Sequence, residues 1–227
     1  MSKKNKLEKF AENKTFPNLF EYSYERIMGE GFPLQGKWHE EFFHNDNPIV
    51  LELGCGKGEY TVGLARVHPE INYIGVDIKG ARLWRGAKTS NEEQMKNVAF
   101  IRTRIELIDQ FFAPNEVSEI WITFCDPQLK KPNKRLTSPR FLATYRHFLQ
   151  DQSTIHLKTD SQELYDYTLN EVLPTEQCEV VFGTDNLYNT DYEGEAKLTQ
   201  TFYERMFLAE GKPITYIQWK VNQNNNN

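Results

Sequence analysis

The sequence predicts an α/β fold in which a doubly wound, mostly parallel sheet carries helices on both faces, as three Rossmann-like α/β/α layers. Short β-prone apolar runs alternate with helical stretches from Pro48 onward, and this alternation is typical of parallel sheets. The first run ends in a glycine-rich loop, at the end of the strand where such sheets bind ligands. The chain has 227 residues, which suits one domain of this kind with a short extension.

Each element follows from a local pattern. Strands are expected at the apolar runs over residues 48–54, 71–77, 98–102, 119–124, 153–158, 178–182 and 214–219. Helices are expected between them, near residues 59–67, 80–95, 138–149, 161–173 and 198–209. Ser138 followed by Pro139 is a typical helix start, with the serine as N-cap and the proline at the first helical position.

The chain divides into three parts. Residues 1–46 hold prolines and glycines among scattered aromatic residues, so we expect an N-terminal arm or cap there. The α/β domain is expected over residues 47–221, and an asparagine-rich, disordered tail over residues 222–227.

Composition limits the partners. The net charge is −5, whereas a nucleic-acid-binding protein usually carries a basic footprint. The positive charge is nevertheless concentrated in lysines at the N-terminus and in a second basic cluster of Lys130, Lys131, Lys134, Arg135 and Arg140. Such a run is often only a solvated face. A phosphate-binding role for the second cluster depends on what lies next to it.

The three cysteines lack the spacing of a disulfide framework or a metal site. No apolar run approaches the length that spans a membrane. We therefore expect a cytoplasmic protein with no metal and no membrane partner. For its oligomeric state, a monomer and a homodimer both stay open.

The loop after the first strand has the pattern of a cofactor site. Glu52 precedes Gly54, Gly56 and Gly58, and glycines at this spacing let the backbone turn tightly and approach a ligand. A dinucleotide fingerprint would need its third glycine at position 59, which is Glu59. The pattern instead resembles the first motif of class I methyltransferases, which bind S-adenosylmethionine (SAM).

The second strand ends at Asp77, where a carboxylate can accept hydrogen bonds from both hydroxyls of a ribose. The alternative is that Asp77 serves only as a turn or helix-cap residue, since aspartate suits both places. Its spacing from the glycine loop favours the ribose contact.

Further along the chain the sequence resembles the bacterial TrmB family of tRNA (guanine-N7)-methyltransferases. The resemblance covers nearly the whole chain and rests on Leu51–Gly58, Asp77, Asp126-Pro127, Leu157–Asp160 and Thr201–Glu204. It also covers the arm segment at residues 6–20. The family commonly has Pro-Asp-Pro-Trp-Pro-Lys around the catalytic aspartate, whereas here Cys125, Gln128 and Leu129 replace two of the prolines and the tryptophan.

This resemblance implies roles for individual residues. It implies a catalytic or guanine-binding role for Asp126. It implies SAM contacts at Glu52, at the glycines of the loop, at Asp77 and at Arg104, which stands where the family often has an acidic residue near the adenine. Substrate contacts are implied at Lys130, Asp160, Thr201 and Glu204.

Several of these residues have a purely structural alternative. Asp160 could be the N-cap of the helix that contains Glu163, in a capping-box arrangement. Thr201 and Glu204 lie three residues apart on one helical face and could be a cap and an exposed acid. His156 lies in an apolar strand and is interpreted as a core residue, as are Trp121 and Trp219.

The leading hypothesis is an RNA-binding enzyme of tRNA modification that transfers a methyl group from SAM to N7 of a guanine. The family resemblance points to the variable loop of tRNA. Two alternatives stay open: a SAM-binding homologue without catalysis, for which the altered residues around Asp126 argue, and a methyltransferase acting on another RNA or a small molecule, for which the acidic net charge argues.

Overall fold

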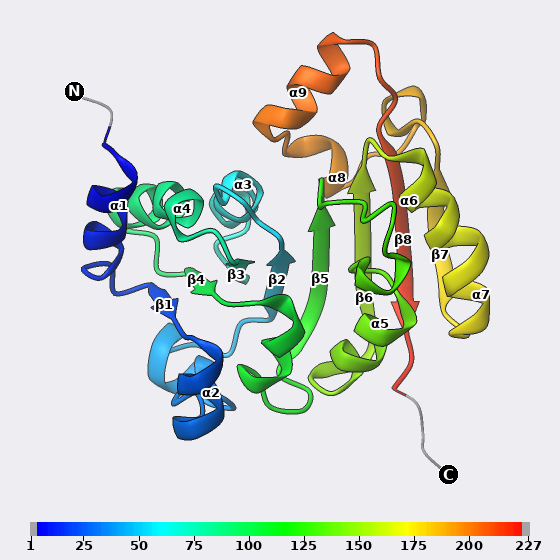
Figure 1. Ribbon diagram of the computed structural model, residues 1–227. Helices are drawn as coiled ribbons and strands as arrows, with labels where there is room; N and C mark the ends of the chain where they lie inside the picture. The colour runs from blue at the N-terminus through cyan, green and yellow to red at the C-terminus, as the bar shows by residue number, and fades with distance from the viewer. Residues whose placement is uncertain (1–3, 224–227) are drawn as a thin grey trace.

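A computed structural model describes residues 4–223 of the chain. Within this range eight strands form one sheet in the order β1-β4-β3-β2-β5-β6-β8-β7. Figure 1 shows the strands running through the molecule with helices around them. Of the expected disordered tail, residues 224–227 lie outside the described range, while Gln223 donates from its side chain to the carbonyl of Leu149 at 2.6 Å.

The strands have the following bounds: β1 Leu19–Glu21, β2 Ile49–Leu53, β3 Asn72–Asp77, β4 Val98–Arg102, β5 Val117–Thr123, β6 Leu149–Thr159, β7 Glu179–Thr184 and β8 Thr215–Val221. The α-helices are α1 Lys6–Asn13, α2 Tyr24–Glu30, α3 Glu59–Val67, α4 Gly80–Glu92, α5 Pro139–Arg146, α6 Gln162–Asp166, α7 Leu173–Thr175, α8 Glu195–Leu198 and α9 Phe202–Ala209. Shorter 3₁₀ and π turns are η1 Trp38–Phe43, η2 Ile105–Gln110, η3 Pro132–Lys134, η4 Tyr167–Val172 and η5 Leu187–Asn189.

The fold class predicted from the sequence is confirmed. The strands from β1 to β6 pair in parallel, and β8 pairs antiparallel to both β6 and β7, so the sheet is mostly parallel. Each expected strand is present, with small shifts at its ends. One strand was not predicted: β1, within the arm, pairs with β4 and extends that edge of the sheet.

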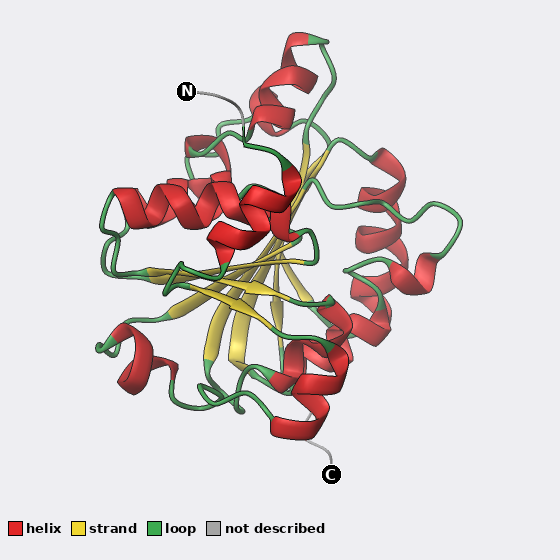
Figure 2. Ribbon diagram, turned by 60° about the vertical axis from the view of Figure 1, so that its left-hand side comes forward, coloured by secondary structure: helices red, strands yellow, loops and turns green. Residues whose placement is uncertain are grey.

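Two apolar layers sandwich the sheet, and Figure 2 shows helices on both of its sides. Successive side chains of a strand point to opposite faces. Leu51 and Leu53 of β2 belong to the core beneath η1, η2, α5 and α6, whereas Val50 belongs to the core beneath α3 and α4. His156 and Trp121 stack with 3.8 Å between their ring centroids, and Trp219 is fully buried, as expected for core residues.

The arm is fixed to the domain by polar contacts. The side-chain amide of Asn13 donates to the carbonyl of Gly80 at 2.9 Å, and that of Asn18 donates to the hydroxyl of Ser90 at 2.8 Å. Both asparagines are buried, so these bonds are shielded from water. Figure 1 shows α1 lying beside α4 as a result.

The sequence predicted the first residues of two helices, and one of these predictions is confirmed. Ser138 is the N-cap of α5 and Pro139 is the first residue, as predicted, but the serine hydroxyl makes no capping bond. Asp160 is not the N-cap of α6; that prediction was wrong by one residue, because the hydroxyl of Ser161 accepts from the backbone N–H of Leu164 at 3.2 Å. Asp160 is thereby left exposed at the end of β6.

In the described part of the chain, no helix is both long and apolar enough to cross a bilayer.

Candidate functional site

The glycine loop that follows β2 is built from left-handed backbone. Gly54, Gly56 and Gly58 have φ angles of 79°, 58° and 69°, a region that side chains disfavour. The backbone N–H of Gly54 donates to the carbonyl of Val76 at 2.8 Å, which holds the loop against β3. These glycines therefore meet the conformational need that the sequence pattern predicted.

The ring of Phe100 packs behind this loop. A Cβ atom added at Gly58 would lie 2.6 Å from the Phe100 ring, and one added at Gly75 or Gly86 would come equally close. Glycines on the loop, on β3 and on α4 thus make room for one aromatic ring of β4. The sequence pattern indicated roles for the loop glycines alone, and this packing around Phe100 was not predicted.

Asp77 connects the loop to the end of β3. Its Oδ2 accepts from the backbone N–H of Gly56 at 2.9 Å, and its Oδ1 accepts from that of Lys79 at 2.7 Å. A carboxylate offers about four lone-pair sites, so both oxygens can still accept from a ligand. The turn role and the ribose role proposed for Asp77 are compatible.

Glu52 is almost completely buried, with 4% of its surface exposed. Its Oε2 accepts from the backbone N–H of Thr61 at 2.8 Å and from the hydroxyl of the same residue, and its Oε1 accepts from the hydroxyl of Thr123 at 2.7 Å. Burial raises the pKa of the Glu52 carboxyl to about 7, against the opposing effect of these hydrogen bonds. Glu52 therefore joins β2, α3 and β5 beneath the loop.

Asp126 lies in the loop after β5 and is exposed. Its Oδ1 accepts from the backbone N–H of Gln128 at 3.0 Å, which forms a tight turn. Phe124 and Gln128, on either side of this turn, have φ angles of 47° and 48°. Non-glycine residues in left-handed backbone are strained, and such strain concentrates at functional sites.

The Asp126 loop and the glycine loop are neighbours. A Cβ atom added at Gly54 would lie 3.9 Å from the Cβ of Cys125. Burial raises the pKa of the Cys125 thiol to about 12, and the nearby charges of Asp126 and Asp160 add to the increase. The carboxyl ends of β2, β5 and β6 therefore bring Gly54, Asp126 and Asp160, all predicted site residues, to one edge of the sheet.

The basic cluster after Asp126 divides into two kinds of residue. Lys130, Lys131, Lys134 and Arg140 are exposed. Arg135 is buried; its Nε donates to the carbonyl of Pro127 at 3.0 Å, and its guanidinium pairs with Glu163 and lies over the ring of Tyr167. Of the five residues for which a phosphate-binding role was considered, Arg135 is the one that does not present its charge to solvent, because its guanidinium is engaged in these contacts and holds the loop in place.

Thr201 and Glu204 form a capping box at the start of α9. The hydroxyl of Thr201 accepts from the backbone N–H of Glu204 at 3.2 Å, and the Glu204 carboxylate accepts from the N–H of Thr201 at 3.3 Å. The alternative of an exposed acid at position 204 was wrong. Glu204 is fully buried and forms an ion pair with Lys158 of β6, a partner that sequence reasoning missed.

Helix α9 stands above the carboxyl ends of β5 and β6, as Figure 1 shows. The backbone N–H of Phe202 donates to the carboxylate of Glu59, the first residue of α3 after the glycine loop, at 3.0 Å. The rings of Phe207 and Phe124 lie 6.0 Å apart between centroids, which joins the helix to the Asp126 loop. Phe202 and Tyr203 are 49% and 43% exposed, so α9 presents aromatic rings beside the site.

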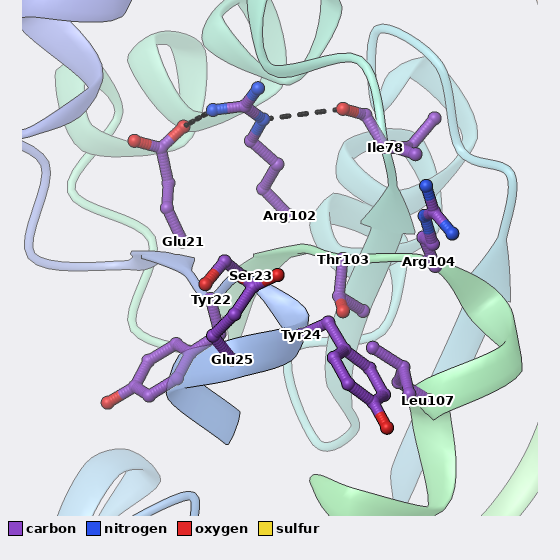
Figure 3. A pocket seen from close by; sticks show the side chains of 10 residues that line it. All are labelled: Glu21, Tyr22, Ser23, Tyr24, Glu25, Ile78, Arg102, Thr103, Arg104 and Leu107. Atoms are coloured by element: carbon purple, nitrogen blue, oxygen red, sulfur yellow. Dashed lines mark hydrogen bonds and ion pairs between the residues drawn. The ribbon is translucent and has the colours of Figure 1, made fainter. Parts of the chain in front are cut away.

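Arg104 lies at the other end of the same edge, after β4. It is exposed and lines a cavity of about 580 Å³ between the arm and the ends of β3 and β4. Figure 3 shows this cavity, with the arm residues opposite Arg104. Arg104 is thus near the end of the β3 strand that carries Asp77, and away from the Asp126 loop.

Known proteins resemble this chain in sequence and in structure. A family described as "Putative methyltransferase" matches residues 46–217. A tRNA (guanine-N(7)-)-methyltransferase of Bacteroides thetaiotaomicron is 52% identical over 97% of this chain and 87% of its own length. A protein of the same name from Christiangramia forsetii is 54% identical over 97% of this chain and 100% of its own length.

Among solved structures, the 16S rRNA methyltransferase KamB superposes with a TM-score of 0.63 at 14% identity, covering 81% of this chain and 92% of that one. A likeness at this identity shows the fold alone. The family match and the sequence relatives show more: this chain belongs to the methyltransferase family whose relatives carry the name tRNA (guanine-N(7)-)-methyltransferase.

Proposed function

We propose that this protein transfers a methyl group from SAM to N7 of a guanine in tRNA. The observation that carries the proposal is the position of Asp126. Its exposed carboxylate lies on a strained turn whose Cys125 packs against the first glycine of the cofactor loop. A base held by Asp126 would meet a cofactor held by that loop.

The residues present suit SAM. The left-handed glycines leave backbone open to a close-lying ligand, and the space beside Gly56 is free within 4 Å of an added Cβ. Asp77 keeps lone pairs for the ribose hydroxyls, and Glu52 supports the loop from beneath. Arg104 marks the adenine end. When bound there, SAM supplies an electrophilic methyl group on its sulfonium.

Asp126 has to recognise and orient the guanine. N7 of guanine has a free lone pair and no proton, so the attack needs no general base. The opposite edge presents the N1–H and N2–H₂ donors, which an ionised carboxylate accepts and which adenine lacks. Asp126 also stabilises the positive charge that develops on the methylated base. Most of the rate enhancement then comes from alignment of N7 with the methyl group.

The tRNA is held around this centre. The relatives' name supports tRNA as the substrate. The exposed Lys130, Lys131 and Lys134 directly follow Asp126 and can neutralise phosphates next to the base. Asp160 is exposed beside Cys125 and can contact the nucleotide, while Thr201 and Glu204 fix α9 over it. A guanine in the variable loop is unstacked at lower cost than one in a duplex. We place the reaction in the cytoplasm. The arm over residues 1–46 serves as a cap on the domain over residues 47–221.

The test compares wild type with Asp126→Asn on bulk tRNA that lacks the modification. Asparagine keeps an oxygen for the Gln128 N–H, so the turn is retained while the negative charge and one acceptor are lost. We expect methyl transfer from labelled SAM to fall about 100-fold or more. The matched control is Asp46→Asn, an exposed aspartate before the amino end of β2, which should keep wild-type activity.

The product is mapped as N7-methylguanine by chemical strand cleavage. Wild-type incorporation at N7 that disappears in Asp126→Asn supports the proposal. SAM binding without incorporation into any RNA would overturn it and favour the second candidate, a SAM-binding protein without catalysis. The replacement of framing residues by Cys125, Gln128 and Leu129 is the observation that favours this candidate. Incorporation into another RNA, or into a small molecule alone, would identify a different substrate.

A further inference from the structure

We propose that the N-terminal arm completes the cofactor pocket: Tyr24 stacks on the adenine ring, and the hydroxyl of Thr103 hydrogen-bonds the edge of the same base. This inference rests on the proposed binding of SAM at the glycine loop and Asp77. It adds a wall that comes from outside the α/β domain.

The strand register places the cavity next to Asp77. Asp77 of β3 is level with Arg102 of β4, and Arg102 is level with Glu21 of β1. Adjacent strands lie about 4.8 Å apart. A ribose held by Asp77 would therefore lie close enough to β4 to place its base in the cavity that follows Arg102.

The cavity is large enough to receive a planar ring. It measures about 580 Å³, within the usual range for small-molecule sites. On one side of the cavity lies Ile78, the residue after Asp77, which is 51% exposed. On the side of the arm lies Tyr24 of α2, which is 57% exposed. Figure 3 shows the Tyr24 ring beside Leu107, with Arg104 and Ile78 above them in the view. A tyrosine ring at such a wall offers a π-face to any base.

Thr103 supplies an independent sign of a ligand. The residue is 3% exposed and lines the cavity, and its Oγ1 has no hydrogen-bond partner among residues 4–223. A buried hydroxyl without a hydrogen-bond partner costs stability, and a ligand that supplies the partner removes this cost. A ring nitrogen or the exocyclic amino group of adenine would satisfy it.

Arg102 fixes the arm wall to the domain. Arg102 donates to Glu21 at 3.1 Å and to the carbonyl of Ile78 at 3.3 Å, and its guanidinium lies over the ring of Phe10. One side chain thus joins α1, β1 and the loop after β3. A wall that is held by such contacts lowers the cost of ordering on binding.

The experiment measures binding of S-adenosylhomocysteine and of 5′-methylthioadenosine by calorimetry, with no turnover involved. Tyr24→Ala should weaken both ligands by a similar factor, roughly tenfold, because the lost contact is to their shared base. Tyr24→Phe should bind like wild type. Met28→Ala is the matched control, since Met28 lies on the same helix, is also 57% exposed and does not line the cavity.

Thr103→Val separates a ligand contact from a structural role. Removing a buried hydroxyl that lacks a partner should leave the melting temperature unchanged or raise it. Affinity for both ligands should nevertheless fall about fivefold. Unchanged affinity in both Tyr24→Ala and Thr103→Val, with tight binding by wild type, would overturn this inference and leave the proposed function intact. Absence of binding by wild type would instead overturn the cofactor assignment itself.

Discussion

The ammonium of Lys158, on β6, lies 2.6 Å from Oε1 of Glu204, on α9, and neither side chain is exposed to solvent. The same carboxylate oxygen accepts from the hydroxyl of Tyr188 at 2.7 Å, and Lys158 also donates to the carbonyls of Ala196 and Thr199. Burial lowers the pKa of Lys158, while Glu204 acts to raise it. This pair ties the helix above the site to the middle of the sheet.

The first prediction concerns this pair. Lys158→Met or Glu204→Met leaves one buried charge without its partner, so each should lower the free energy of unfolding by about 3–5 kcal/mol. The double variant removes both charges and should cost much less than the sum. Urea denaturation at neutral pH measures all four proteins. Additive costs would show that the two side chains do not stabilise each other.

The second prediction is a pH dependence of stability from Glu52. Its pKa is about 7 in the folded protein, against an ordinary value of 4.5. Between pH 4.5 and pH 7 the folded state therefore holds a proton on Glu52 that the unfolded state has released. Stability from this group is therefore greatest below 4.5, decreases by about 3 kcal/mol as the pH rises to 7, and is constant above.

Glu52→Gln should lack this decrease, because glutamine does not titrate. The measurement is the difference in unfolding free energy between wild type and variant from pH 4.5 to 8. Glu106→Gln, an exposed site, is the control and should follow the wild-type curve. A pH-independent difference for Glu52→Gln would contradict the buried, protonated state.

The third prediction compares two glycines of the cofactor loop. Gly56→Ala suffers only the cost of left-handed backbone, about 1 kcal/mol, since an added Cβ meets nothing within 4 Å. Gly58→Ala suffers the same cost and a clash with Phe100, and should lose about 1–3 kcal/mol more. Thermal unfolding without cofactor measures both. Phe100→Leu should recover part of the Gly58→Ala loss; equal costs at the two glycines would refute the packing argument.

The fourth prediction separates two adjacent basic residues. Lys134→Gln should weaken tRNA binding and reduce the slope of log affinity against log salt by about one, the effect of one lost phosphate contact. Arg135→Gln should leave the salt slope unchanged and lower the melting temperature, because Arg135 is buried against Pro127 and Tyr167. Filter binding over roughly 50–200 mM salt measures the slopes. A reduced slope in Arg135→Gln would mean that its charge does reach the RNA.

Features written in local sequence could be predicted, and those that depend on distant partners could not. The strands from β2 to β8 follow from apolar runs, and the glycine loop follows from spacing. β1 was missed because it has three residues in an aromatic-rich arm, and its pairing with Phe100 and its neighbours on β4 joins positions about 80 residues apart.

The same reason explains the misjudged side chains. Spacing places Glu204 on a helical face with Thr201, but only the fold brings Lys158 to that face. Arg135 appears in the sequence as one of several cations, and its burial depends on Glu163 and Tyr167 on a later helix. Asp160 and Ser161 are both good caps, and backbone geometry alone chooses between them.

The position of β8 has a consequence for synthesis. This strand follows every other described element along the chain, yet it lies between β6 and β7 and hydrogen-bonds to both. Before β8 leaves the ribosome, β6 and β7 have no hydrogen bonds to each other. Each then has an unpaired edge, and such edges pair with the strands of other chains. A message that ends just before Thr215 therefore yields a domain with a gap inside its sheet, the kind of product that aggregates and that chaperones and proteases must remove.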